Sequence, residues 1–279
     1  MKAKNNPLVW VAVILIVIVV SYQFGKSNPN DVGQRPSIVE TTETPKRPTT
    51  DLLMAHTQGL PEQILVRAGY TTSYNSETRC PNWTAWHLTA AHTTGDYTRK
   101  GIGFKEDDDV PAPKAQNSDY QRSGYDRGHM CPSGDNKWSK QAQEESFLFT
   151  NMCPQSHDLN AGDWNDLEQK CRKWAKQYGD IYIVCGPVFR PSSSKTNRRK
   201  TIGKNKVAVP TGFYKVVLCM NGTPKAIGFY YDNEDGRRPL ATYVRSVDDI
   251  EQLTGIDFFA ALPDDVENQV EKQADLSAW

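Results

Sequence analysis

One short stretch, residues 125–135, constrains this chain most, because it places Arg127, Gly128 and His129 in a row shortly before Pro132. The Arg127 guanidinium keeps its charge near neutral pH and can hold phosphate oxygens through two parallel hydrogen bonds. The His129 imidazole can accept a proton in the same pH range. Gly128 lets the backbone and a bound molecule approach closely, and Pro132 ends regular structure. The stretch therefore predicts a strand that ends in a loop suited to chemistry at a phosphodiester.

A second interpretation fits the same residues, in which His129 is a core residue beside an ion pair of Asp126 and Arg127. A later stretch favours the first interpretation, since it contains Asn160 and, eight residues further on, Glu168. The two stretches together resemble the DNA/RNA non-specific endonuclease family, whose members carry Asp-Arg-Gly-His, then a metal-binding Asn and a Glu eight residues after it. The resemblance covers about residues 60 to 265. It implies a ββα-metal nuclease core, in which the strand with His129 packs beside a helix that opens near Asn160.

The resemblance also implies a role for each of these residues. Hydrolysis of a phosphodiester needs a base, a cation and a rigid frame for both. We expect His129 to be the general base and Asn160 to hold a single Mg²⁺ ion, with Mn²⁺ as the alternative. One neutral oxygen ligand favours a hard, hydrated cation over zinc. Glu168 is expected to orient water around the ion, and Arg127 and Arg99 to neutralise charge that grows on the phosphate.

Two of the expected site residues follow from their position in the family pattern. Family members place a phosphate-contacting arginine about thirty residues before the histidine, where Arg99 is the nearest match and Lys100 the alternative. Asn151 lies nine residues before Asn160, where the family has another active-site asparagine. We therefore expect Arg99 and Asn151 to join Arg127 in binding the substrate. Asp126 is expected to orient its neighbours rather than to perform chemistry.

The expected reaction is endonucleolytic cleavage without sequence preference. Every group named so far addresses phosphate or metal and none is aimed at a base edge, so we expect both DNA and RNA to be cleaved. The family resemblance implies 5′-phosphate products. Two alternatives remain: an exported phosphodiesterase that acts on another phosphoester, and an inactive, surface-anchored nucleic-acid-binding module. The second would be expected to lose the base or the metal ligand, and this chain has both.

The amino-terminal residues predict a membrane anchor. Residues 1–26 contain a run of about eighteen residues without a charge, which can span a bilayer if the helix tilts or the bilayer thins locally. Positive residues precede this run, so we expect a transmembrane signal anchor with the catalytic domain exported to the periplasmic or extracellular face. If the segment is a cleaved signal peptide, the protein is secreted instead. Residues 27–60 are rich in Pro and Thr and predict a flexible tether.

The remaining chain predicts an α+β domain over residues 61–265, followed by a marginal helix or tail at 266–279. Strands and helices do not alternate regularly, so we expect a mixed, mainly antiparallel sheet flanked by helices. Strands are expected at residues 64–66, 83–89, 181–185, 213–219 and 226–231, and helices at 139–149, 163–178 and 246–253. An apolar stripe at helical spacing in 163–178 indicates a core helix.

The charge distribution and the cysteine pattern constrain the function less than the motifs do. The formal net charge is zero, but a basic run over residues 195–206 could line a phosphate channel beside a nuclease motif. The six cysteines show no paired CxxC spacing, which makes a zinc site an unlikely use of them. Their even number fits disulfides if the domain lies outside the cytoplasm, and the sequence does not choose among the pairings. Cys185 with Cys219 is the pair that we favour, since both end apolar strand-like runs.

Overall fold

The computed structural model describes residues 55–57, 59–190, 199–234 and 236–279. The predicted anchor at residues 1–26 and all but the end of the predicted tether lie outside these ranges. Among the residues that are described, no helix is both long and apolar enough to cross a membrane.

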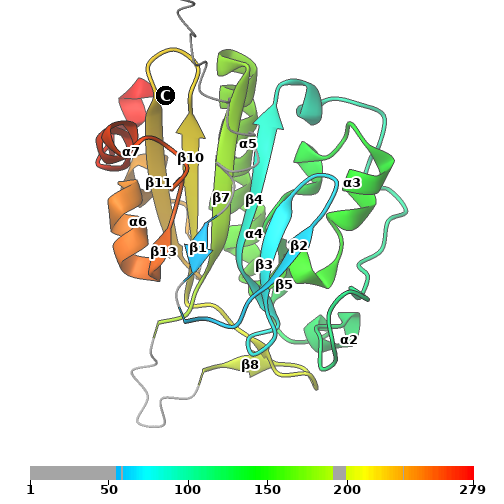
Figure 1. Ribbon diagram of the computed structural model, residues 1–279. Coiled ribbons are helices and arrows are strands. Elements are labelled where there is room, and N and C mark those ends of the chain that lie inside the picture. Colours follow the sequence, from blue (N-terminus) through cyan, green and yellow to red (C-terminus); the bar gives the residue numbers. More distant parts are fainter. Residues whose placement is uncertain (1–54, 58, 191–198, 235) are drawn as a thin grey trace, which may run out of the picture. The chain divides into compact units, whose positions relative to one another are not determined.

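A seven-stranded sheet forms the centre of the domain, with strand order β12-β11-β10-β7-β4-β3-β2 (Figure 1). All of its neighbouring pairs are antiparallel, so the expectation of a mixed sheet was wrong in this detail. The expected strands are present. The bounds are β2 (Gln63–Val66), β3 (Thr71–Asn75), β4 (Cys80–Thr89), β7 (Asp180–Val188), β10 (Gly212–Cys219), β11 (Lys225–Asp232) and β12 (Val244–Arg245).

Both faces of the sheet are covered, which explains why its central strands are apolar at almost every position. Successive side chains of a strand point to opposite faces. In β10, Phe213 and Val217 therefore belong to one core, and Tyr214 and Val216 to the other. We call the face that carries Phe213 and Val217 the catalytic face, because the strand with the predicted base lies on that side, and the face that carries Tyr214 and Val216 the rear face.

The catalytic face is covered by α5 (Asp163–Tyr178) and by a small antiparallel pair, β5 (Asp126–His129) and β6 (Met152–Gln155). Helix α5 packs on β4 and β7 and buries Trp164, Leu167 and Trp174, and Gly179 ends it with a positive φ of 94°. Shorter helices complete this side: α2 (Asn117–Tyr120), α3 (Lys140–Glu145) and α4 (His157–Ala161). Ser139 caps α3 as expected, since its hydroxyl accepts a hydrogen bond from the Ala142 N–H. The pair β8 (Thr201–Ile202) and β9 (Val207–Ala208) lies in the partly described basic segment.

The rear face is covered by α6 (Val247–Thr254) and α7 (Asp264–Glu271). Helix α6 has the predicted start, with Ser246 in a capping box, and ends at the left-handed Gly255. Strand β1 (His56–Thr57) pairs with β13 (Ile256–Asp257), so the folded part begins before residue 61. Residues 266–279 are packed rather than loose, because Val270 is fully buried and the Trp279 ring lies 4.8 Å from that of Trp174.

The favoured disulfide is not formed. The six cysteines are all described, buried and free. The register of β7 with β10 places Lys215, not Cys219, opposite Cys185. Cys219 lies four residues further along β10, beyond the reach of a disulfide bond, which needs Cα atoms about 4.4–6.8 Å apart.

Candidate active site

The pairing of β5 with β6 brings the two sequence stretches together. Their register places His129 opposite Met152 and Asp126 opposite Gln155. Gly128 is required by this packing, because a Cβ atom there would lie 2.7 Å from the buried Cβ of Gln155. The glycine thus makes room for a neighbouring side chain, which differs from the close approach of a substrate that the sequence led us to expect.

A cavity of about 560 Å³ opens beside this strand pair. Five of the six predicted site residues line it: Arg99, Arg127, His129, Asn160 and Glu168. Lys137 and Arg172 add positive charge to its wall. The cavity therefore collects cationic groups around a histidine, an amide and a carboxyl group, as an anionic ligand requires.

His129 stands in an apolar surrounding at the edge of the cavity. The Phe147 ring meets its imidazole edge-on at 5.0 Å, and Phe104 lies 5.7 Å away. Its Nε2 atom is enclosed without a hydrogen-bond partner. Burial and the charge of Arg99 lower the pKa of His129 to about 3. The ring is therefore neutral at physiological pH and keeps a nitrogen lone pair that can accept a proton.

The two arginines are held in place without being neutralised. Arg127 donates through Nε to the side-chain oxygen of Asn117 at 2.9 Å, and its guanidinium lies 5.4 Å from the Phe104 and Tyr120 ring centres. The Arg99 guanidinium lies 5.6 Å from the Phe147 ring centre. Within the described ranges neither arginine forms an ion pair with a carboxylate. The alternative in which Arg127 pairs with Asp126 is therefore not what the fold contains.

Asp126 instead binds two groups on α4. Its Oδ2 atom accepts hydrogen bonds of 2.9 Å from Asn160 Nδ2 and from His157 Nδ1. An ionised carboxylate can only accept hydrogen bonds, so the NH₂ end of the Asn160 amide must face Asp126. Among the residues that the structure describes, none donates a hydrogen bond to the Asn160 oxygen. His157 is exposed, and the contact with Asp126 raises its pKa.

Glu168 belongs to a group of charged residues buried beneath the cavity. Its side chain is 13% exposed, and Arg172 lies 4.0 Å away and also donates to Asp135 at 2.8 Å. Burial raises the pKa of Glu168 to about 7, while the nearby Lys215 counteracts the rise. Glu168 therefore changes its charge near neutral pH.

Lys215 is a buried charged residue beneath the cavity that the sequence analysis did not single out. It lies in β10 on the catalytic face, is fully buried, and its Nζ has no hydrogen-bond partner. The ammonium lies 4.4 Å from the Trp164 ring centre and 5.1 Å from that of Trp86. A lone lysine inside the apolar run at residues 213–219 was the available signal. With Arg172 it balances the charges of Asp135 and Glu168.

Asn151 is the one predicted site residue that the fold does not bring into the cavity. Its side chain is fully buried. The amide nitrogen donates at 2.8 Å to the carbonyl oxygens of Cys131 and Ser146, and the amide oxygen accepts from the Cys131 N–H at 2.9 Å. These bonds hold the loop that follows His129.

The described donors fit a hard divalent cation. The Asn160 oxygen lacks a protein partner, and Glu168 lines the same cavity one helix further on. A single amide oxygen together with water and substrate oxygens is a ligand set typical of Mg²⁺, which keeps several waters in protein sites. All six cysteines are described and none of them lines the cavity, so no thiolate favours zinc there.

Known proteins share this sequence and fold. Nuclease EXOG of Danio rerio is 39% identical over 218 residues, which cover 73% of this chain and 64% of that protein. The chain thus spans a little under two thirds of the EXOG relative. Nuclease C1 of Cunninghamella echinulata is 39% identical over 215 residues, covering 73% of this chain and 85% of that protein. Human endonuclease G is 34% identical over 211 residues, covering 72% and 71%.

A solved structure and a family profile agree with these relatives. A chain of the EndoG/EndoGI complex, solved to explain EndoG inhibition, superposes with a TM-score of 0.69 at 30% identity, covering 72% of this chain and 87% of that one. The profile of the DNA/RNA non-specific endonucleases matches residues 51–265. This match spans the strand pair, the cavity and the sheet behind them, and the chain belongs to the DNA/RNA non-specific endonuclease family.

Proposed function

We propose that this protein is a Mg²⁺-dependent, sequence-non-specific endonuclease that cleaves DNA and RNA and leaves 5′-phosphate ends. One observation carries the proposal: the same cavity is lined by a neutral histidine, by an amide oxygen and by two arginines, and among the described residues the oxygen has no protein partner and the arginines form no ion pair. Such a set can bind a phosphodiester, accept a proton from water and hold a cation.

His129 is the general base in this proposal. Its imidazole is neutral before the substrate enters, so it can accept the proton of the attacking water. A pKa of about 3 makes the ring a weak base on its own. The negative charge of a bound phosphodiester opposes the effect of Arg99 and raises the pKa of His129. Binding of the substrate therefore makes the base stronger when it is needed.

Arg127 and Arg99 bind the phosphate. Asn117 and the surrounding rings fix the direction of the Arg127 guanidinium, so little side-chain entropy is lost when a phosphate binds. Both arginines are assigned to phosphate oxygens and neither to a base edge. This assignment supports cleavage without sequence preference. Lys200, which donates to the Tyr125 hydroxyl at 2.7 Å, extends positive charge towards the start of β5.

Asn160 and Glu168 would hold the cation. The amide oxygen of Asn160 would bind it directly, and the Glu168 carboxylate would orient water around it. When bound, Mg²⁺ stabilises negative charge on the leaving 3′ oxygen. Asp126 keeps the amide oxygen turned towards the cavity, and Lys215 helps to keep Glu168 ionised.

We also propose that residues 1–26 anchor the protein in a membrane with the catalytic domain exported. The support is the uncharged apolar run and the positive residues that precede it. Protease added to cells whose outer envelope has been opened, with the inner membrane intact, should digest the catalytic domain of an exported protein. Full protection of the domain until the inner membrane is broken would contradict this proposal.

The decisive experiment compares three substrates. The full chain is incubated with supercoiled plasmid, with RNA and with a small-molecule phosphodiester, each in Mg²⁺ and in excess EDTA. We expect plasmid and RNA to be cut in Mg²⁺ alone. The exported phosphodiesterase alternative predicts turnover of the small ester with both polymers intact. The inactive binding module predicts a gel shift without cleavage.

A pair of histidine variants ties the activity to the cavity. His129→Ala should abolish cleavage of both polymers while leaving the unfolding midpoint in urea nearly unchanged. His56→Ala is the matched control, because His56 is exposed in β1 and does not line the cavity. Equal activity of the two variants would be incompatible with His129 as the base.

A further inference from the structure

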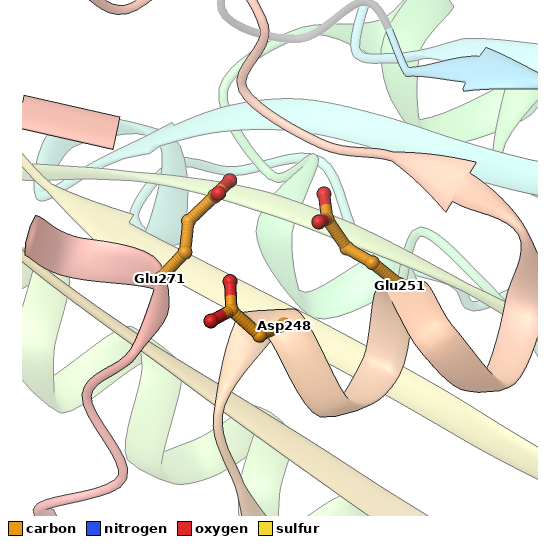
Figure 2. Close-up of side chains that lie close together, drawn as sticks. All are labelled: Asp248, Glu251 and Glu271. Carbon is orange, nitrogen blue, oxygen red and sulfur yellow. The ribbon is translucent and has the colours of Figure 1, made fainter. Parts of the chain in front are cut away.

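Three carboxylates converge on the rear face, away from the catalytic cavity (Figure 2). Asp248 and Glu251 lie one turn apart in α6, and Glu271 lies in the last turn of α7. One oxygen atom from each lies within 4.8 Å of the other two. Both helices pack on the core that the rear face of the sheet forms.

Glu271 is buried in a way that calls for a partner. The residue is only 6% exposed, and its Oε1 atom is enclosed without a hydrogen-bond donor. A buried carboxylate oxygen without a partner is strongly disfavoured, because the water that solvated it has been lost. The side chain points into the space that it shares with Asp248 and Glu251.

In the described part of the chain, no positive side chain pairs with these carboxylates. Within the described ranges, none of the three carboxylates forms an ion pair with a lysine, arginine or histidine. Glu251 accepts a hydrogen bond from the Phe258 N–H at 2.7 Å through Oε1, which satisfies one of its oxygens. Further acidic groups, Glu267 and Asp257, act on the pKa of Glu271. The end of α7 adds partial negative charge, since the last carbonyl groups of a helix point there.

We propose that Asp248, Glu251 and Glu271 form a Ca²⁺ site that ties α6 to the end of α7. All three donors are carboxylate oxygens, which suit a hard cation. Oxygens on opposite sides of Ca²⁺ are about 5 Å apart, so the observed spacing fits its coordination distances. Asp248 is only partly buried, which leaves room for the waters that complete six to eight ligands.

The site acts on stability rather than on chemistry. It lies on the opposite side of the sheet from His129 and shares no residue with the cavity. A bound cation would replace repulsion between two helices with a shared ligand. Binding to the folded state alone raises the unfolding temperature with ligand concentration.

The first test measures binding directly. Equilibrium dialysis with radioactive Ca²⁺ is carried out on the full chain carrying Asn160→Ala, which removes the proposed catalytic ligand. We expect one bound Ca²⁺ per chain, and loss of that ion when Glu271→Gln is added. No bound Ca²⁺, or an ion retained in the double variant, overturns the proposal. The measurement does not depend on nuclease activity, so the Ca²⁺ site can be confirmed or rejected whether or not the proposed function is correct.

The second test compares matched charge variants by thermal unfolding at pH 7.5. At Ca²⁺ a hundredfold above its dissociation constant, the unfolding temperature of the unmodified chain should rise by about 5 °C or more relative to EDTA. Asp265→Asn removes one charge from the exposed side of α7 and should keep this rise. Glu271→Gln should lose it, yet unfold at a higher temperature than the unmodified chain in EDTA, because repulsion is relieved.

A third variant covers a failure of Glu271→Gln to fold. Glu251→Gln keeps an oxygen for the Phe258 N–H and removes one ligand charge. It should weaken Ca²⁺ binding at least tenfold at full nuclease activity. An unchanged Ca²⁺ response in this variant, or the same response in all variants, would mean that protons alone hold the three carboxylates together.

Discussion

The Oδ2 atom of Asp126 accepts a hydrogen bond of 2.9 Å from Nδ2 of Asn160, so a strand residue decides which end of a helix amide faces the cavity. The two residues are 34 positions apart in the chain and meet only because β5 lies against α4. The carboxylate cannot exchange roles with the amide, because it has no proton to donate near neutral pH.

Replacement of Asp126 should therefore weaken binding of the metal rather than the chemistry itself. In Asp126→Ala the Asn160 amide can turn. Loss of a partner that orients a metal ligand typically lowers metal affinity 10–100-fold. We expect the Mg²⁺ concentration for half-maximal cleavage to rise by roughly that factor, with activity recovered at high Mg²⁺. His157→Ala removes the other donor to Asp126 and should leave the Mg²⁺ titration within about twofold of the unmodified chain.

Asn160→Ala should be far more damaging. The change removes the amide oxygen that the proposal assigns to the cation, so plasmid cleavage should fall by about two to four orders of magnitude even at saturating Mg²⁺. Asn160 is only partly buried, and circular dichroism and the urea midpoint should change little. An unchanged cleavage rate would remove Asn160 from the metal site.

The pH profile should report Glu168 and not His129. The pKa of Glu168 is raised from its usual value to about 7, so its carboxylate is lost as the pH falls below 7. With a pKa of about 3, His129 stays neutral throughout this range. We expect kcat/KM to fall about tenfold per pH unit below pH 7 and to level off above it. A flat profile between pH 5 and 8 would show that the charge on Glu168 is not needed.

Lys215 should set the position of that acid limb. Its ammonium lowers the pKa of Glu168, so Lys215→Met should move the limb to higher pH. The same change leaves buried acids with one cation fewer and should destabilise the fold by about 3–5 kcal/mol, measured by urea unfolding. Lys173→Met, on the exposed side of α5, is the control and should alter neither property.

Asn151→Ala should act on stability. Each end of its amide is bonded to the backbone, and the variant leaves those buried groups without partners. We expect the free energy of unfolding to fall by about 3 kcal/mol, with KM for DNA unchanged in the folded fraction. A KM that rises several-fold at unchanged stability would restore the role in substrate binding that the sequence indicated.

Short-range patterns predicted the elements well. The apolar stripe of α5 and the bounds of α6 each depend on neighbours in sequence, and both are present. The motif spacing likewise identified five residues that share one cavity.

Long-range packing decided what could not be predicted. The register of β7 with β10 separates Cys185 from Cys219, and no local signal fixes such a register. Asn151 occupies a motif position, but its role depends on which backbone groups come within reach after folding. In the sequence, Lys215 is only a charged residue inside an apolar strand. Its role depends on α5, which packs on the sheet and brings Glu168 close to it. Gly128 similarly owes its place to Gln155, which lies on the partner strand.

Adjacent positions along β10 serve separate compartments, since Tyr214 and Val216 pack beneath the C-terminal helices while Lys215 sits under the catalytic groups. A substitution scan along this single strand therefore compares the two faces of the sheet at alternating positions. Odd positions should disturb turnover as well as stability, because they pack beneath the catalytic groups, whereas even positions should disturb stability alone.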